Sequence, residues 1–434
     1  MSGGLGEVFR ALRVRDFRLF VLGQIVSVAG TWMMVVAQDW LVLGLTGGSA
    51  SALGTVTALQ FAPLLLFTLY GGRLADRYDK RALLTVANVL SCVLALALAV
   101  LVLAGEVRLW HVYVFACALG VVNSVEVPAR MAFVGELVGS DLLPNASALS
   151  AAYFNVARVV GPALSGLLIS VAGVGWVMLL NAVSYAATVV ALRLMRGRAG
   201  GAARRGDRVR VLDGLKAAGR FDLVVPLVLV AVVGLFGLNF QLTLPLLAAQ
   251  VHHAGASTFG VVTAVFAAGS LVAALATTVR RGRPSARLVA GAAVGFGVLE
   301  AGVGVVSSYG LSMVLLFLTG GASIFFVQAA NHRVQLGVPP ELRGRVLALY
   351  TLILQGSTPL GALLVGALAD RWGVRWGFVA GGLVSLAAGL AAVVVGRRGE
   401  RGDGGRGKGE AKDGGGSAEV VARGRESSGE RARP

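Results

Sequence analysis

The chain has 434 residues, of which 56% are apolar and only 14% are charged, and its mean hydropathy is +0.77. Soluble proteins carry about a quarter charged residues, so this composition excludes a soluble enzyme and, despite the net charge of +17, a nucleic-acid-binding protein. Apolar stretches of twenty or more residues recur along nearly the whole chain, which predicts a polytopic helical membrane protein.

Twelve apolar stretches are long enough to cross a membrane as tilted helices. In chain order they are 17–45, 52–74, 82–104, 109–130, 146–171, 175–195, 222–249, 257–279, 286–306, 310–332, 345–369 and 374–396. The sequence therefore predicts an all-α membrane protein with twelve transmembrane helices in two six-helix bundles.

Two polar stretches set the expected domain boundaries. Residues 197–221 separate six spans from six, and residues 397–434 contain 11 Gly, 17 charged residues and no aromatic residue. A segment of that composition cannot bury a core. We expect an N-terminal bundle over 1–196, a cytoplasmic linker over 197–221, a C-terminal bundle over 222–396 and a disordered cytoplasmic tail over 397–434.

The distribution of basic residues predicts the orientation. With the N-terminus inside, 35 of the 39 Lys and Arg residues fall in inner segments, three fall outside and Arg158 lies within a span. Basic residues accumulate on the cytoplasmic side, so both termini are expected inside. Tryptophan supports the same limits, because Trp40, Trp110, Trp176, Trp372 and Trp376 fall at predicted outer ends.

A weak internal repeat relates the two halves. Ser147 and Pro162 are fifteen residues apart, and so are Gly344 and Pro359. The fifth span therefore resembles the eleventh, as expected if a unit of six spans was duplicated.

The most specific motif runs from Gly72 to Arg81, in the inner loop between the second and third spans, and reads Gly-Arg-Leu-Ala-Asp-Arg-Tyr-Asp-Lys-Arg. A glycine lets helices approach closely, and an acid beside several cations at a helix end could lock one packing of two bundles. The alternative is a basic inner loop with a stray acid.

Together with the twelve spans and the basic central loop, this motif resembles the major facilitator superfamily over about residues 10–396. Several stretches are similar to the group of enterobactin exporters and macrolide efflux proteins, also called transmembrane secretion effectors. They are Phe9–Leu12 with Asp16–Arg18, Thr46, Asp76–Asp79, Pro128–Arg130 with Glu136–Val138, Asn145-Ala146, and Arg158 before Gly161-Pro162. The resemblance implies alternating access between the bundles and export driven by a proton gradient.

The resemblance also implies an inner gate. Asp76 should cap the N-terminal end of the eleventh helix near Gly344, where a carboxylate is favoured, and Arg77 should pair with Glu126. Gly161-Pro162 is similar to the antiporter signature of the superfamily, although a Gly-Pro pair is also a common helix kink. The expected gate and motif residues are Gly72, Asp76, Arg77, Lys80, Arg81, Glu126, Arg130, Gly161 and Pro162.

A second stretch, Gly366–Gly373, reads like another copy of the inner motif, with Asp370 in place of Asp76. The predicted topology puts it on the outer side, so we expect the match to be chance. The inner equivalent between spans eight and nine is Arg280–Arg283, which retains the charge but lacks the acid.

Ionisable residues within spans are costly and mark candidate functional sites. The candidates for proton coupling are Asp39, Glu126, Arg158 and Glu300. Alternatives remain open for three of them: Arg158 could be structural, and Asp39 and Glu300 could be interfacial, because each lies near the outer end of its span.

Neutral amides cluster on spans one, four, seven and ten, which line the central cavity in the superfamily. The substrate-cavity candidates are Gln24, Gln38, Asn123, Asn239, Gln241, Gln328 and Asn331. Aromatic walls could come from Phe20, Trp32, Phe61, Phe236, Phe240 and Phe325. Either set could instead hold helices together or face lipid.

No nucleotide-binding Gly-x-x-x-x-Gly-Lys-Ser/Thr motif occurs, and His252-His253 has no nearby third metal ligand. We expect no cofactor, no metal and no enzymatic activity. The sequence favours a monomeric, proton-coupled exporter in the cell membrane, whose substrate is a hydrophobic or amphipathic drug, siderophore or secondary metabolite. The alternatives are an importer of a small nutrient and a non-transporting membrane sensor or scaffold.

Overall fold

The computed structural model describes residues 9–196, 219, 223–251, 255–278 and 282–413. Every regular element in these ranges is a helix. In chain order they are η1 (Arg10–Arg13), α2 (Arg15–Thr46), α3 (Ala50–Arg77), α4 (Lys80–Leu103), α5 (Leu109–Ala172), α6 (Val174–Leu194), α8 (Val224–Phe236), α9 (Phe240–Leu246), the π-helical η2 (Leu247–Val251), α10 (Ala256–Thr278), α11 (Ala286–Val305), α12 (Tyr309–Gln335), α13 (Pro340–Trp372) and α14 (Val374–Asp413). Eleven candidate spans in this described part are long and apolar enough to cross a membrane.

Helix α5 contains two of the twelve predicted spans. Its 64 residues include Gly139, whose φ of 72° and ψ of 176° are not helical. Residues on both sides of Gly139, such as Val134 and Tyr153, line the same cavity. The chain therefore reverses at this glycine, which tolerates a positive φ without the steric cost of a side chain.

The seventh predicted span, 222–249, is not one continuous helix. Helix α8 ends at Phe236, Gly237 to Asn239 are non-helical, and the short helix α9 and the π-helix η2 follow. The amides of Gly237 and Leu238 both donate to the Val233 carbonyl, at 2.8 and 3.0 Å. The Asn239 side-chain amide donates to the Leu235 carbonyl at 2.9 Å, replacing a backbone donor.

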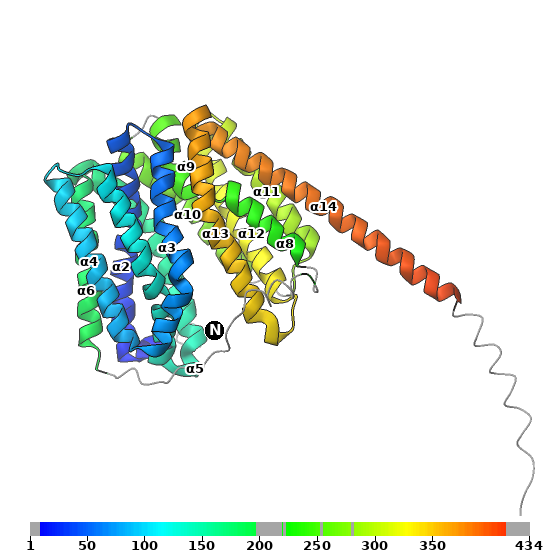
Figure 1. The fold of residues 1–434 in the computed structure, drawn as a ribbon, viewed down its shortest axis with the longest axis horizontal. Coiled ribbons are helices and arrows are strands. Elements are labelled where there is room, and N and C mark those ends of the chain that lie inside the picture. The colour runs from blue at the N-terminus through cyan, green and yellow to red at the C-terminus, as the bar shows by residue number, and fades with distance from the viewer. Residues whose placement is uncertain (1–8, 197–218, 220–222, 252–254, 279–281, 414–434) are drawn as a thin grey trace, which may run out of the picture.

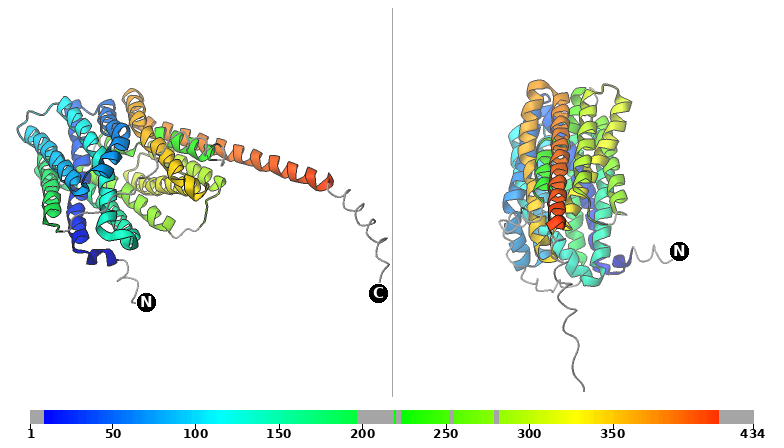
Figure 2. Two further views of the ribbon diagram at one scale, coloured as in Figure 1. Left: turned by 60° about the horizontal axis from the view of Figure 1, so that its bottom comes forward. Right: turned by 90° about the vertical axis from the view of Figure 1, so that its right-hand side faces the viewer.

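The last helix is longer than predicted. The apolar part of α14 ends at Val395, but the helix continues to Asp413 and projects beyond the other helices (Figure 2). The sequence predicted disorder from residue 397. Arg, Lys and Glu, which favour helices, stand between the glycines of this segment. Residues 414–434 and the linker residues 197–218 lie outside the described ranges.

The helices form two groups that lie side by side (Figure 1). Helices α2 to α6 contact one another, and so do α8 and α10 to α14. The main contacts between the groups join α3 to α13 and α5 to α10. Figure 1 shows α3 and α13 close together at the top and diverging towards the bottom.

Short polar and glycine signals set the helix ends. Ser49, Asp79 and Ser285 cap α3, α4 and α11 by accepting backbone N–H bonds of 3.2, 2.7 and 3.1 Å. Gly173 and Gly373, with φ of 89° and 92°, end α5 and α13 in matching turns before α6 and α14. These two turns follow the fifth and eleventh predicted spans, which the sequence repeat relates.

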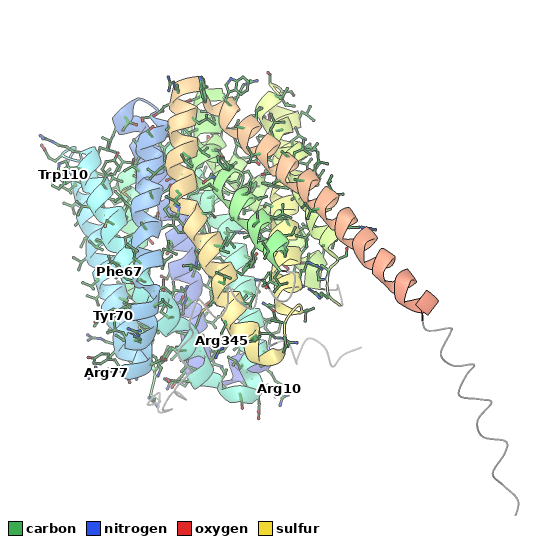
Figure 3. All side chains as sticks on the ribbon, turned by 45° about the vertical axis from the view of Figure 1, so that its right-hand side comes forward. Arg10, Phe67, Tyr70, Arg77, Trp110 and Arg345 are labelled. Atoms are coloured by element: carbon green, nitrogen blue, oxygen red, sulfur yellow. The ribbon has the colours of Figure 1, made fainter. Side chains whose placement is uncertain are left out.

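The two ends of the molecule differ in composition (Figure 3). We call one end the basic face, because it holds Arg10, Arg77 and Arg345, and the opposite end the tryptophan face. Trp110, Trp176, Trp372 and Trp376 are more than half exposed there. Trp40 is an exception to the predicted belt, because it is partly buried and stacks on Phe259 of α10 with ring centroids 6.3 Å apart.

Candidate functional site: a central cavity between two gates

A groove of about 420 Å³ separates α3 from α13 towards the basic face. Its lining residues are Phe61, Leu64, Leu65, Thr68 and Leu69 of α3, and Gly344, Leu347, Ala348, Thr351, Leu352 and Gln355 of α13. The two groups of helices are therefore open to each other at this end.

The predicted contacts of Asp76 and Arg77 are not formed in this structure. Asp76 is exposed, and it has no hydrogen-bond or ion-pair partner among the described residues. Helix α13 begins at Pro340, so Gly344 lies inside the helix rather than at its N-terminus. The Arg77 guanidinium lies 5.8 Å from the centroid of the Tyr78 ring.

Glu126 pairs with Arg130 instead of Arg77. The Glu126 carboxylate lies 3.3 Å from the Arg130 guanidinium, one helical turn along α5. Residues four apart on a helix face each other, so this local partner needs no movement of α3. The predicted Arg77–Glu126 pair is therefore absent from this conformation.

Other residues of the Gly72–Arg81 motif tie together the N-terminal group of helices. The Lys80 ammonium lies 2.6 Å from the Glu136 carboxylate of α5, and both side chains are largely buried. The Arg81 guanidinium donates to the carbonyls of Met195 and Arg193 at 2.8 and 3.2 Å, at the C-terminal end of α6. These contacts of the motif therefore hold α4 against α5 and α6.

The close helix approach at this motif uses Gly71 rather than Gly72. A Cβ added to Gly71 would lie 1.9 Å from the Ser124 carbonyl oxygen of α5, whereas one added to Gly72 would meet nothing within 4 Å. The sequence prediction placed the packing role one residue too late. A shift of one residue turns a side chain by about 100° around a helix.

We expect the Lys80–Glu136 pair to stabilise the fold. Lys80→Met leaves a buried carboxylate without its counter-charge and should cost about 3 kcal/mol. The double variant with Glu136→Leu should recover most of that loss. Thermal unfolding of the detergent-solubilised protein measures both, with the exposed Arg77→Met as the control. A double variant as unstable as Lys80→Met would contradict this account.

The tryptophan face is closed by Asp370, near the end of α13. Its carboxylate accepts hydrogen bonds from the backbone N–H groups of Ala50 and Ser51 at 2.6 and 2.8 Å, and from the Ser49 hydroxyl at 3.1 Å. Asp370 thus caps the N-terminus of α3 across the boundary between the two groups of helices. We call these contacts the Asp370 cap.

The Asp370 cap gives a structural role to a stretch, Gly366–Gly373, for which the sequence predicted none. Gln250 adds a second contact across the boundary, because its side-chain amide donates to the Gly48 carbonyl at 2.6 Å. Around Asp370, a Cβ added to Gly366 would lie 2.8 Å from the Ala50 carbonyl, and one added to Gly54 would lie 2.4 Å from the Ala362 carbonyl. The backbones of α3 and α13 are therefore in direct contact at this end.

Gly161 and Pro162 lie where α5 packs against α2 of its own group and against α10 of the other group. A Cβ added to Gly161 would lie 2.7 Å from the Trp32 Cβ of α2. The Pro162 carbonyl faces Gly260 of α10, where an added Cβ would lie 2.5 Å away. The pair allows close packing within its own group and against the other one.

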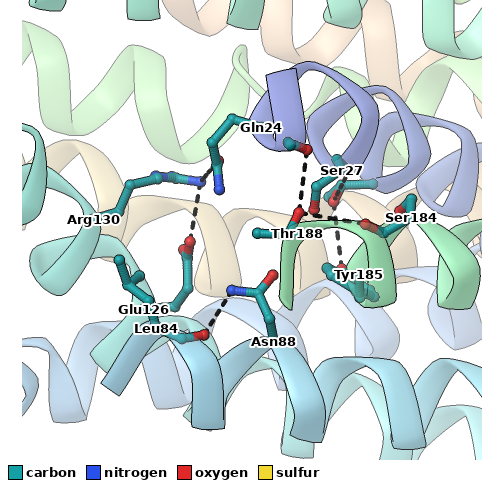
Figure 4. Close-up of polar contacts among 11 residues, drawn as sticks. Gln24, Ser27, Leu84, Asn88, Glu126, Arg130, Ser184, Tyr185 and Thr188 are labelled. Atoms are coloured by element: carbon teal, nitrogen blue, oxygen red, sulfur yellow. Dashed lines mark hydrogen bonds and ion pairs between the residues drawn. The ribbon is translucent and has the colours of Figure 1, made fainter. Parts of the chain in front are cut away.

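A polar cavity of about 280 Å³ adjoins the groove, and Phe61 and Leu64 line both. Glu126, Arg130 and Asn123 line it, and Figure 4 shows the Glu126–Arg130 ion pair and the 3.5 Å contact of Arg130 with Gln24. The other polar lining residues are Ser27, Thr31, Gln60, Asn88, Ser91, Tyr185 and Gln241. Nearly all of this polarity comes from the N-terminal group of helices.

A second cavity of about 140 Å³ lies next to the polar one, and Trp32, Val35 and Gln241 line both. Its walls are mostly apolar, but they include Asp39 and Arg158. Asp39 is 2% exposed, and its Oδ2 atom has no hydrogen-bond partner among the described residues. The Arg158 Nε atom also lacks one there.

Several residues predicted for the cavity lie elsewhere. Gln328 accepts a hydrogen bond of 2.5 Å from the Thr277 hydroxyl of α10, and Asn331 accepts one of 2.6 Å from Gln335. Asn239 occupies the break after α8, Gln38 is buried without lining either cavity, and Gln24 reaches the cavity only through Arg130. Gln328 and Gln24 connect helices, as the alternative interpretation expected, whereas Asn331 and Asn239 bond within their own helical segment.

Of the predicted aromatic residues, Trp32, Phe61 and Phe240 line the cavities. Phe20 is buried and packs edge-to-face on Phe133, 5.4 Å away. Sequence reasoning did not propose a cavity role for Gln60, Asn88, Ser91, Tyr185 or Phe154. Asn88 and Ser91 are three residues apart on α4 and share one helix face, which was the available signal. His252-His253 and Arg280-Arg281 lie outside the described residues.

The sequence profile of a family described as transmembrane secretion effector matches residues 7–400. Among curated proteins, the multidrug efflux pump Tap of Mycolicibacterium fortuitum is 28% identical over 390 residues, which cover 87% of this chain and 95% of that protein. The staphyloferrin A transporter of Staphylococcus aureus is 25% identical, with coverage of 85% and 93%. Macrolide efflux protein A of Streptococcus pyogenes is 23% identical, with coverage of 86% and 94%.

Solved transporter structures share the fold. A bacterial homologue of the lysosomal transporter Spinster, in an inward-facing and occupied conformation, matches with a TM-score of 0.70 and 13% identity, covering 88% of this chain and 97% of that one. A D-xylose–proton symporter matches with a TM-score of 0.67 and 12% identity, covering 86% and 97%.

Proposed function

We propose that this chain, which belongs to the transmembrane secretion effector family, exports a hydrophobic or amphipathic small molecule by proton-coupled alternating access. Its family and the eleven candidate spans in the described part of the chain make it a multi-pass protein of the cell membrane. Relatives named as efflux pumps for multiple drugs and for macrolides, and as a siderophore transporter, support the choice of substrate class. In the proposal, the chain acts as a monomer.

The observation that carries the proposal is that α3 and α13 meet at one end of the molecule and separate at the other. We call these two ends the gates. At the tryptophan face α13 caps α3 through Asp370, while at the basic face the same two helices leave a groove and Asp76 has no partner among the residues that the structure describes. In the proposed cycle, the Asp370 cap at the tryptophan face breaks when Asp76 caps α13 at the basic face, so that the two ends open and close in turn. If the basic face is cytoplasmic, the structure represents the inward-facing state.

The cavity suits a ligand that is partly polar. Glu126 and Arg130 could hold opposite charges or dipoles of a substrate, and Trp32, Phe61 and Phe154 provide apolar walls. Ligand pockets in proteins combine apolar lining with a few convergent polar groups. A tight, wholly polar site, as a nutrient importer would need, is not what these residues form.

Asp39 is the proposed proton carrier. An unpaired carboxylate buried beside an apolar cavity is costly when ionised, and Arg158 lines the same cavity. A proton from one side of the membrane could neutralise Asp39, and the nearby guanidinium could favour its release on the other side.

Topology is the first test. The bias of 35 basic residues to three predicts that the basic face is cytoplasmic. A fluorescent protein fused after Asp413 should therefore fluoresce, and alkaline phosphatase inserted after Gly47 should be active. Phosphatase activity from a fusion after Asp413 would reverse the orientation.

Transport itself is tested in proteoliposomes containing the purified chain. A panel of a macrolide, a lipophilic dye cation and staphyloferrin A is followed with an imposed pH gradient of either sign and with none. Export predicts accumulation that requires the gradient and reverses with its sign. If every compound that is taken up accumulates to the same level with and without the pH gradient, proton coupling is refuted. If no compound of a wider drug panel is transported, the sensor alternative is favoured.

A further inference from the structure

Three oxygen atoms surround the backbone at Gly237 and Gly381 inside the C-terminal group of helices, and none of their residues lines either cavity. They belong to the Glu300 carboxyl of α11, the Ser385 hydroxyl of α14 and the Phe236 carbonyl at the end of α8. Glu300 is 3% exposed and Ser385 is fully buried. Neither Glu300 Oε2 nor Ser385 Oγ has a hydrogen-bond partner among the described residues.

Two glycines bring these oxygen atoms together. A Cβ added to Gly237 would lie 2.7 Å from Ser385 Oγ and 3.0 Å from Glu300 Oε2. A Cβ added to Gly381 of α14 would lie 2.5 Å from the Phe236 carbonyl oxygen and 3.0 Å from Glu300 Oε1. The Glu300 carboxyl therefore lies between the break after α8 and the facing surface of α14.

The break after α8 leaves the Phe236 carbonyl without its helical donor. The Asn239 side chain serves the preceding carbonyl, that of Leu235, and the amides of Gly237 and Leu238 turn back to Val233. No backbone amide of the described chain donates to the Phe236 oxygen. A buried carbonyl without a donor is uncommon and costly.

The cluster has too many acceptors and too few donors. An ionised carboxylate only accepts hydrogen bonds, the carbonyl only accepts, and the serine hydroxyl supplies a single donor. Protonation of Glu300 removes the buried charge and adds a second donor, an O–H that a rotation of the side chain can direct to the Phe236 carbonyl or to Ser385 Oγ. One added proton therefore relieves the shortage of donors around Glu300.

In the described part of the chain, the helices packed against Glu300 supply no counter-charge for an ionised Glu300 carboxylate. Helices α8 and α9 contain no titratable residue. In the apolar part of α14 the one charged residue is Arg375, which donates to the Val305 carbonyl and the Ser307 hydroxyl. On α12 the titratable residues are Tyr309, His332 and Arg333, and no ion pair joins Glu300 to any group in the described part of the chain.

We propose that Glu300, Ser385 and the Phe236 carbonyl form a proton-binding site inside the C-terminal group of helices, and that proton occupancy holds α8 in its broken form. A hard metal ion is a poorer fit, because such ions take six or more oxygen ligands. Three protein oxygens meet here, and the Phe296 ring crowds the same point, with Cε1 2.7 Å from the added Gly237 Cβ.

The break connects this site to the cavity. Phe240 begins α9 directly after it, packs edge-to-face on Phe296 with centroids 6.0 Å apart, and lines the Asp39 cavity together with Gln241. A change in the conformation of the break would therefore move Phe240 and Gln241, two residues that line this cavity. The site itself does not depend on the proposed export, but its role in a transport cycle does.

Infrared difference spectroscopy of the full chain in lipid bilayers tests the site without a substrate. A pH step should reveal a protonated-carboxyl C=O band that Glu300→Gln removes and Asp39→Asn leaves in place. Ser385→Ala should shift the frequency or the titration midpoint of this band. Ser165→Ala, a buried serine of α5, is the matched control and should leave the band unchanged.

A C=O band set that is identical in wild type and Glu300→Gln would overturn the proposal. If Glu300→Gln does not fold, an unshifted band in Ser385→Ala overturns it instead. Loss of the band when NaCl replaces KCl at constant ionic strength would assign the site to sodium, against the proton. An intact band in a protein that transports nothing would refute the export function and leave the site standing.

The effect on the cavity is measured by thiol labelling in a background lacking Cys92 and Cys117. The rate at which Gln241→Cys is labelled should depend on pH more strongly than ionisation of the thiol alone explains. Adding Glu300→Gln should remove this extra pH dependence. Gln60→Cys, which lines the same cavity from α3, supplies the matched control. Equal pH dependence of Gln241→Cys with and without Glu300 would separate the site from the cavity and overturn the second half of the proposal.

Discussion

Asp370→Asn should shift the protein away from the conformation described above and towards one that is open at the tryptophan face. The variant keeps the shape of the side chain but loses the negative charge that receives the N–H groups of Ala50 and Ser51. Hydrogen bonds to charged groups are about twice as strong as neutral ones. Because Asp370 is exposed, solvent reduces the gain, and we expect a net change of about 1.4 kcal/mol, which is tenfold in population.

The distance between the basic-face ends of α3 and α13 measures that shift. Spin labels at Tyr78 and Arg343, both exposed, report it in a background without Cys92 and Cys117. In Asp370→Asn the population at short distance should rise about tenfold, because closure of the basic face accompanies opening of the other. Distance distributions that match the wild type would reduce the Asp370 cap to a passive contact.

Asp76→Asn is the matched control on the opposite face. Asp76 has no hydrogen-bond or ion-pair partner in the described part of the chain, so we expect its charge to add little to the stability of the state seen here. In the proposed cycle Asp76 stabilises the other state, and its loss should lengthen the average distance between the same labels. The two variants should therefore move one equilibrium in opposite directions, which a general loss of stability would not do.

The sequence predicted most helices to within a few residues, because the length of an apolar run fixes the length of a membrane-spanning helix. Polar caps such as Ser49 and Asp79 then set individual starts. The break after Phe236 was missed, since Gly237 and Asn239 are each unremarkable in a membrane helix. The break depends on the glycines of other helices: Gly361 accommodates the Leu235 carbonyl, and Gly381 accommodates that of Phe236. Such contacts are invisible in a local pattern.

The candidate site was predictable where a residue type is costly in a membrane, and less so where a partner decides its role. Asp39 and Arg158 were singled out by charge and line a cavity. Gln328 resembles a cavity residue in sequence, but Thr277 on the neighbouring helix engages it. Asp370 was set aside because its motif lies on the wrong face for an inner gate. Its partners are about 320 residues away in sequence, and only the fold brings them together.

Asp39→Asn should abolish gradient-driven export and retain exchange of substrate down its own gradient. The amide mimics the protonated carboxyl in shape and charge, so binding and movement of the helices should persist. No proton can then be carried, because the amide does not ionise near neutrality. Accumulation driven by a pH gradient should fall to the level of empty liposomes, whereas counterflow of labelled against unlabelled substrate should stay close to that of the wild type.

Glu126→Gln is the matched control for this prediction. Glu126 is also a carboxylate in a cavity wall, but Arg130 lies 3.3 Å from it, whereas no ion pair joins Asp39 to any group in the described part of the chain. Because Glu126 already engages Arg130 beside the polar cavity, it should contribute to substrate binding rather than carry the proton. Its amide variant should raise KM and leave the dependence on the pH gradient intact. Gradient-driven accumulation that survives in Asp39→Asn and disappears in Glu126→Gln would exchange the roles of the two acids, because the unpaired carboxylate would then be shown not to load the proton.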